Sequence, residues 1–228
     1  MMPQIKGKLI VIEGGDGSGK ATQTQLLVKG LSKKHKVTFF EFPRYKQSQF
    51  GKLIRRSLTG EFGDFLNLSP YLSSLPHMLD RVRAKNLMLE ALKEGDIVCD
   101  RYTPSNLAHQ SAKLHKKERA AFISFIEETE YGELGMPTPD IVIYLWVPAD
   151  ISRKLMLKRA KREKSKLDSY EDRTEYQSKV IDMYLKLAKQ RSNWFVVKCV
   201  DSRGKLLSKN TIHKMVFQIV AKRLKIKQ

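Results

Sequence analysis

The chain has 228 residues, 41% of them hydrophobic, and a formal net charge of +19, which suits one domain with a sizeable buried core. No apolar run approaches the roughly 18 residues of a membrane-spanning helix, so we expect no contact with a membrane. The first residues, MMPQIKGKLIVIEGG, contain no small-residue cleavage site, so we expect no signal peptide and a cytoplasmic protein.

Short apolar runs alternate with longer amphipathic stretches along the whole chain. The runs rich in β-branched and aromatic residues predict strands, which are KLIVIE, KVTFFEF, DIVCD, DIVIYLWV and WFVVKCV. Between them the spacing of apolar residues predicts helices over 20–35, 49–58, 70–93, 103–114, 117–131, 149–164, 171–190 and 208–224. Buried strands separated by helices indicate a single α/β domain over 1–228, with a five-stranded parallel sheet and helices on both faces.

The segment after the first predicted strand fits the pattern G-x-x-x-x-G-K of a phosphate-binding loop. Backbone N–H groups of such a loop surround a phosphate, the next helix adds its positive N-terminus, and the lysine reaches the outer phosphates. A dinucleotide-binding loop would need glycine at position 20, which is lysine. The alternative is a tight turn with a chance lysine. The candidate nucleotide-binding residues are Gly14, Gly15, Asp16, Gly17, Ser18, Gly19, Lys20, Ala21 and Thr22.

Ala21 stands where a hydroxyl ordinarily binds the magnesium ion of the nucleotide. Magnesium keeps several waters, so phosphate oxygens and a carboxylate elsewhere in the chain can still hold it. Asp100 is the first candidate, because it ends an apolar strand, where α/β sheets present their sites. Arg101 beside it can hold an anion, although a structural ion pair would explain the same Asp-Arg sequence.

Two further features bear on partners and location. Cys99 and Cys199 lie in strand-like runs, so we expect buried thiols rather than a disulfide. From Ile151 onward, 22 Lys and Arg stand against 7 Asp and Glu, whereas the first 150 residues have 21 against 17. The densest run, SRKLMLKRAKREKSK, predicts a solvated helix face, a phosphate clamp or a nucleic-acid contact. It has no interleaved aromatic residues, so we expect no nucleic-acid partner.

The whole chain resembles the thymidylate kinases among the nucleoside monophosphate kinases. The resemblance is carried by EGGDGSGKATQ, EFPRYKQSQFGKLIRRSLTGEFGD, LDRVRAKN, DRYTPSNLAHQ, PDIVIYLWVP and RAKREKSKLDSYE. It implies transfer of the ATP γ-phosphoryl group to dTMP with Mg²⁺, giving dTDP and ADP. It also implies a homodimer and a mobile lid over about residues 158–170.

The resemblance assigns roles to several side chains. Arg44 and Arg101 match residues that hold the acceptor phosphate, and Asp16 matches a carboxylate near the sugar or the metal. Arg81 matches the arginine that reads the thymine edge; its alternative is a helix-surface arginine paired with Asp80. Ser105 and Asn106 match positions near the base, and their alternative is a helix N-cap, which Thr103 could also provide.

The same resemblance implies a function for the basic run SRKLMLKRAKREKSK. Arg159 and Arg162 lie three apart, on one helix face, and match lid arginines that act on the transferring phosphoryl group; the neighbouring lysines are interpreted as mostly solvated. Glu171 matches a carboxylate near the acceptor and the metal, and Tyr170 is expected to pack beneath it. The magnesium candidates are therefore Asp16, Asp100 and Glu171.

Two positions depart from the family pattern. His77 stands where a ring, most often Phe, stacks on thymine, and His109 stands where Tyr or Phe walls the sugar. Histidine offers less stacking area and can carry a charge. These replacements keep open a related kinase of another deoxynucleotide or nucleoside. The basic charge and Ala21 keep open a non-catalytic nucleic-acid-binding protein on a kinase scaffold.

Overall fold

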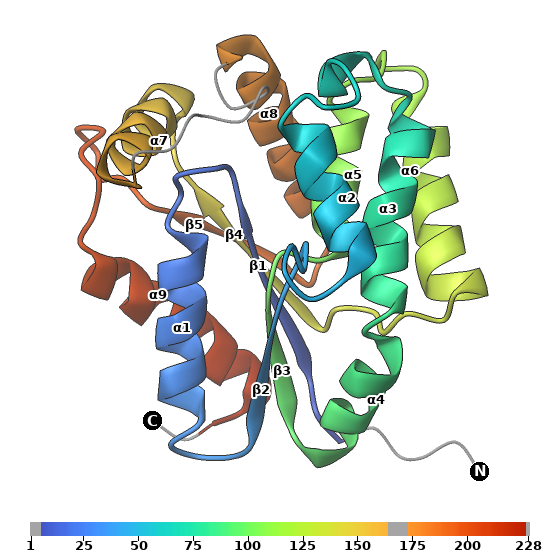
Figure 1. The fold of residues 1–228 in the computed structure, drawn as a ribbon. Helices are drawn as coiled ribbons and strands as arrows, with labels where there is room; N and C mark the ends of the chain where they lie inside the picture. The colour runs from blue at the N-terminus through green and yellow to red at the C-terminus, as the bar shows by residue number, and fades with distance from the viewer. Residues whose placement is uncertain (1–5, 164–172, 227–228) are drawn as a thin grey trace.

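The computed structural model describes residues 6–163 and 173–226. Its sheet has five parallel strands in the order β2-β3-β1-β4-β5, as Figure 1 shows. The strands are β1 (Leu9–Gly14), β2 (Val37–Glu41), β3 (Asp96–Asp100), β4 (Ile141–Trp146) and β5 (Trp194–Lys198). The predicted five-stranded parallel sheet is confirmed, and the bounds of each strand lie within two residues of those expected.

Side chains alternate between the two faces of β1 and build two separate cores. Leu9 and Val11 belong to one apolar cluster, while Ile10 and Ile12 belong to the other. The second cluster lies under α1 (Lys20–Leu31) and α9 (Lys209–Leu224), which pack against each other on one face of the sheet (Figure 1). Helices therefore cover both faces, as expected for a parallel sheet whose central strands β1, β3 and β4 are largely buried.

The opposite face of the sheet carries most of the remaining helices. They are α2 (Gln49–Leu58), α3 (Pro70–Val82), α4 (Lys85–Glu94), α5 (Thr103–Ser111), α6 (Arg119–Glu127) and α8 (Thr174–Gln190). A 3-10 turn, η1 (Phe65–Asn67), precedes α3, and a π-helical turn, η2 (Glu128–Glu133), continues α6. The helix α7 (Ala149–Glu163) carries the basic run and lies beside α8.

Four predicted helices end differently in the structure, and one of them is 103–114, since α5 ends at Ser111. The stretch 70–93 is not one helix, because α3 ends at Val82 and α4 begins at Lys85. The first helix ends at Leu31 rather than at position 35, and the α-helical part of 117–131 is shorter, since a π-helical turn replaces its end. Of the lid segment, residues 164–170 lie outside the described residues.

The two cysteines are free and buried, so the prediction of unpaired thiols is confirmed. Within the part of the chain that the structure describes, no helix is both long enough and apolar enough to cross a membrane.

Candidate functional site

The glycine-rich loop joins β1 to α1, at the carboxyl edge of the sheet. Gly17 and Gly19 have φ angles of 77° and 85°, in the left-handed region that residues with a Cβ atom rarely adopt. A Cβ atom at Gly17 would also lie 2.8 Å from the carbonyl oxygen of Ser152. The sequence therefore folds into a loop that presents its backbone toward the space beyond β1.

Lys20 and Asp16 lie together at this loop. The Lys20 ammonium donates to the carbonyl oxygen of Gly15 at 2.8 Å and lies 3.9 Å from Asp16 Oδ1. Burial, with the charge of Arg101, lowers the pKa of Lys20 to about 8. Burial raises the pKa of Asp16, but the charges of Arg101 and Lys20 outweigh this effect and bring that pKa down to about 2.

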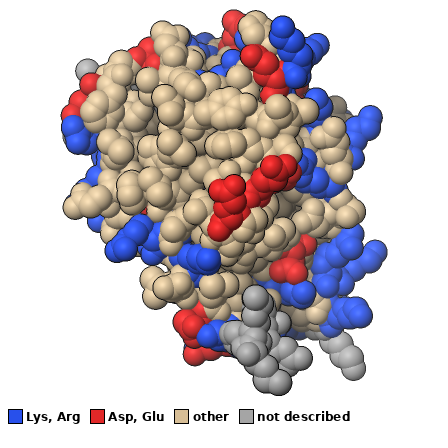
Figure 2. Space-filling view, turned by 90° about the vertical axis from the view of Figure 1, so that its right-hand side faces the viewer, with Lys and Arg blue, Asp and Glu red and all other residues tan. Residues whose placement is uncertain are grey.

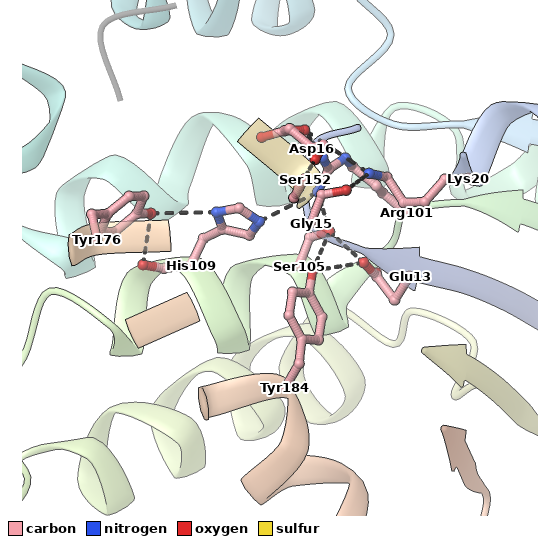
Figure 3. Close-up of polar contacts among 10 residues, drawn as sticks. All are labelled: Glu13, Gly15, Asp16, Lys20, Arg101, Ser105, His109, Ser152, Tyr176 and Tyr184. Atoms are coloured by element: carbon pink, nitrogen blue, oxygen red, sulfur yellow. Dashed lines mark hydrogen bonds and ion pairs between the residues drawn. The ribbon is translucent and has the colours of Figure 1, made fainter. Parts of the chain in front are cut away.

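Arg101 connects the loop to the turn after β3. Its guanidinium forms an ion pair with Asp16 and also donates to Ser105 Oγ at 3.5 Å (Figure 3). Its φ angle of 64° is unusual for a residue with a side chain, and strained backbone of this kind clusters at functional sites. The backbone N–H of Arg101 donates to the carbonyl of Ile12 at 3.0 Å, which fixes the turn beside β1.

The loop and this turn open into a cavity of about 930 Å³. The part of its wall near the loop includes Lys20 and Asp100, while Arg159 and Arg162 reach it from α7. The wall also includes side chains of α3 and α5, so the cavity extends from the phosphate loop toward the opposite layer of helices. Such a volume suits small-molecule ligands.

The part of the cavity wall on α3 contains two neighbouring ion-pair systems. Arg81 is buried and donates to Glu130 on η2 through Nε at 2.7 Å and Nη2 at 2.5 Å. Asp80 accepts from the backbone N–H of Arg44 at 2.8 Å and from its Nε at 3.3 Å. Asp80 of α3 thus fixes Arg44, and Glu130 of η2 fixes Arg81, in both cases by charge-assisted hydrogen bonds.

Residues 12–210 match the family described as thymidylate kinase. The chain is 32% identical over 203 residues to a thymidylate kinase of Mycobacterium tuberculosis strain H37Rv, covering 87% of this chain and 94% of that protein. It is 30% identical over 222 residues to a thymidylate kinase of Arabidopsis thaliana, covering 96% of this chain and 73% of that one. The chain belongs to the thymidylate kinase family.

A solved structure shares the fold. The thymidylate kinase of Candida albicans aligns with a TM-score of 0.74 and 22% identity, covering 97% of this chain and 94% of that one. The α/β architecture of the thymidylate kinases therefore extends over nearly the whole chain described here.

Most residues that the sequence and the family pattern single out meet at the cavity. Its wall includes Asp16, Gly17, Gly19, Lys20, Ala21, Thr22, His77, Arg81, Asp100, Arg101, Ser105, Asn106, His109, Arg159 and Arg162. Four others lie near the site without lining the cavity, and these are Gly14, Gly15, Ser18 and Arg44. Glu171 and Tyr170 lie outside the described residues.

Three alternative interpretations of these residues are wrong. Arg81 is not a surface residue paired with Asp80, because it is buried against Glu130. Neither Ser105 nor Asn106 caps α5, since that helix begins at Thr103 and has no side-chain N-cap. Thr103 does not cap it either, as its hydroxyl donates to Glu130 at 2.8 Å.

Two buried carboxylates of the site, Glu13 and Glu130, were not predicted from the sequence. Glu13, at the end of β1, accepts hydrogen bonds from the Tyr102 backbone, Ser105 Oγ and Tyr184 OH at 2.8–3.0 Å. A charged residue within an apolar strand was a signal for it. Glu130 gave no signal of this kind, because it lies in an ordinary amphipathic stretch.

The donor set near the loop fits a magnesium ion. Asp16 Oδ2 and Ser18 Oγ are buried without a hydrogen-bond partner in the described structure, and Asp100 adds a second carboxylate to the cavity wall. Burial raises the pKa of Asp100, while nearby Lys20 and Arg101 act in the opposite direction. Among the described residues no group of three His, Cys, Asp or Glu side chains could hold a metal, so waters and phosphate oxygens would complete the shell.

Proposed function

We propose that this thymidylate kinase transfers the γ-phosphoryl group of ATP to the 5′-phosphate of dTMP, giving dTDP and ADP. The observation that carries the proposal is one continuous cavity, with the phosphate loop at one part of its wall and Arg81, His77 and Asn106 at another. Such an arrangement holds the phosphoryl donor and the acceptor side by side, so that the transfer between them proceeds as an effectively unimolecular step.

The cationic side chains supply the electrostatic part of catalysis. Lys20 and the loop backbone hold the ATP phosphates, Arg101 faces the acceptor phosphate, and Arg159 and Arg162 stabilise charge on the transferring group. Arg44 supports the acceptor phosphate from a position fixed by Asp80. Asp16 and Asp100, with Glu171 from outside the described residues, would hold Mg²⁺, which neutralises charge on the phosphate oxygens when bound.

The acceptor base is read on α3 and α5. Arg81 uses Nε and Nη2 for Glu130, and we propose that its Nη1 donates to a carbonyl oxygen of the base. Asn106 and His77 complete this part of the wall. Burial and the charge of Arg81 lower the pKa of His77 to about 3, so its ring is neutral and stacks on a base without adding charge.

A panel of acceptors tests this function directly. ADP formation from ATP is measured with dTMP, dUMP, dGMP, dCMP and UMP in turn, with the wild-type chain and Lys20→Met as the matched inactive control. The proposal expects the highest kcat/KM with dTMP. A clear preference for another acceptor would instead favour the related kinase that the two histidines keep open.

We also propose a homodimer formed through the outer face of α3 and α6. Leu72, Leu75 and Leu79 lie on one side of α3 and are 68%, 41% and 40% exposed, and Phe125 on α6 adds to them. Figure 2 shows this side of the molecule as a broad, largely uncharged area. Two copies that each carry +19 repel each other elsewhere, so an uncharged apolar face is where a second copy approaches most readily.

We further propose a cytoplasmic location, since free, buried cysteines are typical of proteins in a reducing compartment.

A further inference from the structure

His109 on α5 lies between Arg101, in the turn after β3, and Tyr176 on α8. Its Nε2 atom is 3.3 Å from Arg101 Nη1, and its Nδ1 atom is 3.3 Å from the hydroxyl of Tyr176 (Figure 3). The Tyr176 hydroxyl also donates to the His109 carbonyl oxygen at 3.0 Å. One imidazole thus touches the arginine that faces the acceptor and the helix that follows the lid segment.

These contacts determine which ring nitrogen carries the proton. Arginine can only donate hydrogen bonds, so Nε2 of His109 must accept from Arg101. The proton of a neutral ring is then on Nδ1, which donates to Tyr176. Burial and the charge of Arg101 lower the pKa of His109 to about 3, which agrees with a neutral ring at physiological pH.

Arg101 is therefore held from two sides. One side of its guanidinium pairs with Asp16 in the phosphate loop, and the other donates to His109. The backbone of Arg101 has a left-handed conformation, which is unusual for a residue with a side chain. The hydrogen bonds of its guanidinium fix the side chain in addition to those that fix the backbone.

We propose that His109 is a positioning residue for Arg101: its neutral imidazole, oriented by Tyr176, accepts a guanidinium N–H and so aims Arg101 at the acceptor phosphate. The inference rests on the proposed contact between Arg101 and that phosphate. The family pattern implies only that residue 109 lies against the sugar, so this role is additional. It also makes the orientation of Arg101 depend on α8, through Tyr176.

A second tyrosine of α8 supports this link between α8 and the site. Tyr184 donates to Glu13 at 2.8 Å and stacks on Tyr144 with ring centroids 4.6 Å apart. It also meets the His109 ring edge-on at 6.0 Å. The helix is therefore anchored below the site by Tyr184, so that Tyr176, two turns earlier, reaches His109 from a fixed position.

The test combines His109→Phe, His109→Gln and Tyr176→Phe with Arg101→Ala in double-mutant cycles. Phenylalanine keeps the ring but removes the acceptor, so kcat/KM for dTMP should fall about tenfold, the size expected for losing a hydrogen bond to a charged group. Glutamine, whose Oε1 can accept in place of Nε2, should recover most of the loss. Tyr176→Phe should give a smaller loss, and KM for ATP should stay unchanged in all three.

The cycle separates positioning from a direct contact with the acceptor. In the Arg101→Ala background, His109→Phe should cause no further loss, because the group that it orients is gone. His213→Phe on α9, the matched substitution at a histidine outside the site, should leave all kinetic constants unchanged. An additive loss in the double variant, or a His109→Phe effect confined to the ratio of dTMP to UMP, would overturn the proposal. If Arg101→Ala itself left the dTMP kinetics unchanged, the assignment of Arg101 to the acceptor would fail instead.

Discussion

At the scale of single residues, the site depends on how buried charges are balanced. Asp16 lies between Arg101 and Lys20; both cations lower the pKa of Asp16, and Arg101 lowers that of Lys20 while Asp16 raises it. One carboxylate among two cations leaves the cluster with a net positive charge, which an ATP phosphate can neutralise. Lys20 and Arg101 are already largely removed from water before ATP binds, so the phosphate need not displace their hydration shells.

The shifted pKa of Lys20 predicts an alkaline limit on ATP binding. An ammonium is charged below its pKa, so Lys20 is charged at pH 7 and loses that charge as the pH rises through about 8. We expect kcat/KM for ATP, which reports the free enzyme, to fall over this range. Lys20→Arg keeps its charge throughout, so any residual activity of this variant should lack the limit. A flat wild-type profile across pH 8 would contradict the prediction.

Ala21 predicts that magnesium depends on carboxylates. Asp100→Asn should reduce activity about 10- to 100-fold and raise the magnesium concentration needed for half-maximal turnover. Ala21→Ser should change both values little, because waters and phosphate oxygens can take the place of that hydroxyl. Turnover measured against magnesium concentration compares the two variants with wild type. If the wild type were inactive and Ala21→Ser were active, the prediction would be contradicted, because magnesium would then depend on the loop hydroxyl.

The buried pair of Arg81 and Glu130 predicts a large cost when one partner is lost. Glu130→Ala leaves a buried guanidinium without its carboxylate, so urea titration should show a loss of about 3 kcal/mol in the free energy of unfolding. The double variant with Arg81→Met and Glu130→Met should recover most of it. Glu61→Ala, at an exposed pair with Arg56, should leave stability nearly unchanged. Equal losses at both carboxylates would contradict this account.

The sequence predicted the residues of the loop because their pattern is local. A strand, two glycines with positive φ and a lysine at a helix start follow one another directly, so spacing alone predicts their chemistry. The supporting carboxylates could not be predicted in this way. Glu130 is 49 residues from Arg81 in the chain, and only tertiary packing brings them together.

At the scale of helices and strands, local signals placed the centres of the elements better than their ends. Short runs rich in β-branched and aromatic residues predicted every strand, including β2 and β5, which are only partly buried. The break after α3 was missed, since Arg83 and Ala84 carry no glycine or proline to mark it. The proline present nearby, Pro76, lies inside α3 instead. No turn residue in the sequence therefore marks the end of this helix.

The helix α7 carries the prediction about the lid arginines. Arg159 and Arg162 both line the cavity, and the charge of Arg159 helps to lower the pKa of Asp16. Arg159→Ala or Arg162→Ala should lower kcat about 100-fold and leave dTMP binding nearly intact, because these groups act on the transferring phosphoryl. Lys161→Ala, an exposed lysine of the same helix, serves as control. If kcat were unchanged in both arginine variants, the basic run of α7 would be only a solvated helix face.

At the scale of the whole molecule, the apolar face of α3 and α6 predicts the oligomeric state. Sedimentation should give twice the chain mass of 26.3 kDa for the wild type. Leu72→Glu and Leu75→Glu should give monomers, because a charge would be buried in the interface. Leu206→Glu, at an exposed leucine outside this face, should leave the dimer intact. A wild-type monomer at micromolar concentration would rule the interface out.

The fate of the γ-phosphoryl group tests the central claim most directly. ATP labelled in its γ-phosphate is mixed with dTMP and the wild-type chain, and the label is followed in dTDP and in inorganic phosphate, with Lys20→Met as control. We predict one labelled dTDP for each ADP formed, and no turnover in the control. Label released as inorganic phosphate, or ADP formed equally well without dTMP, would contradict the account.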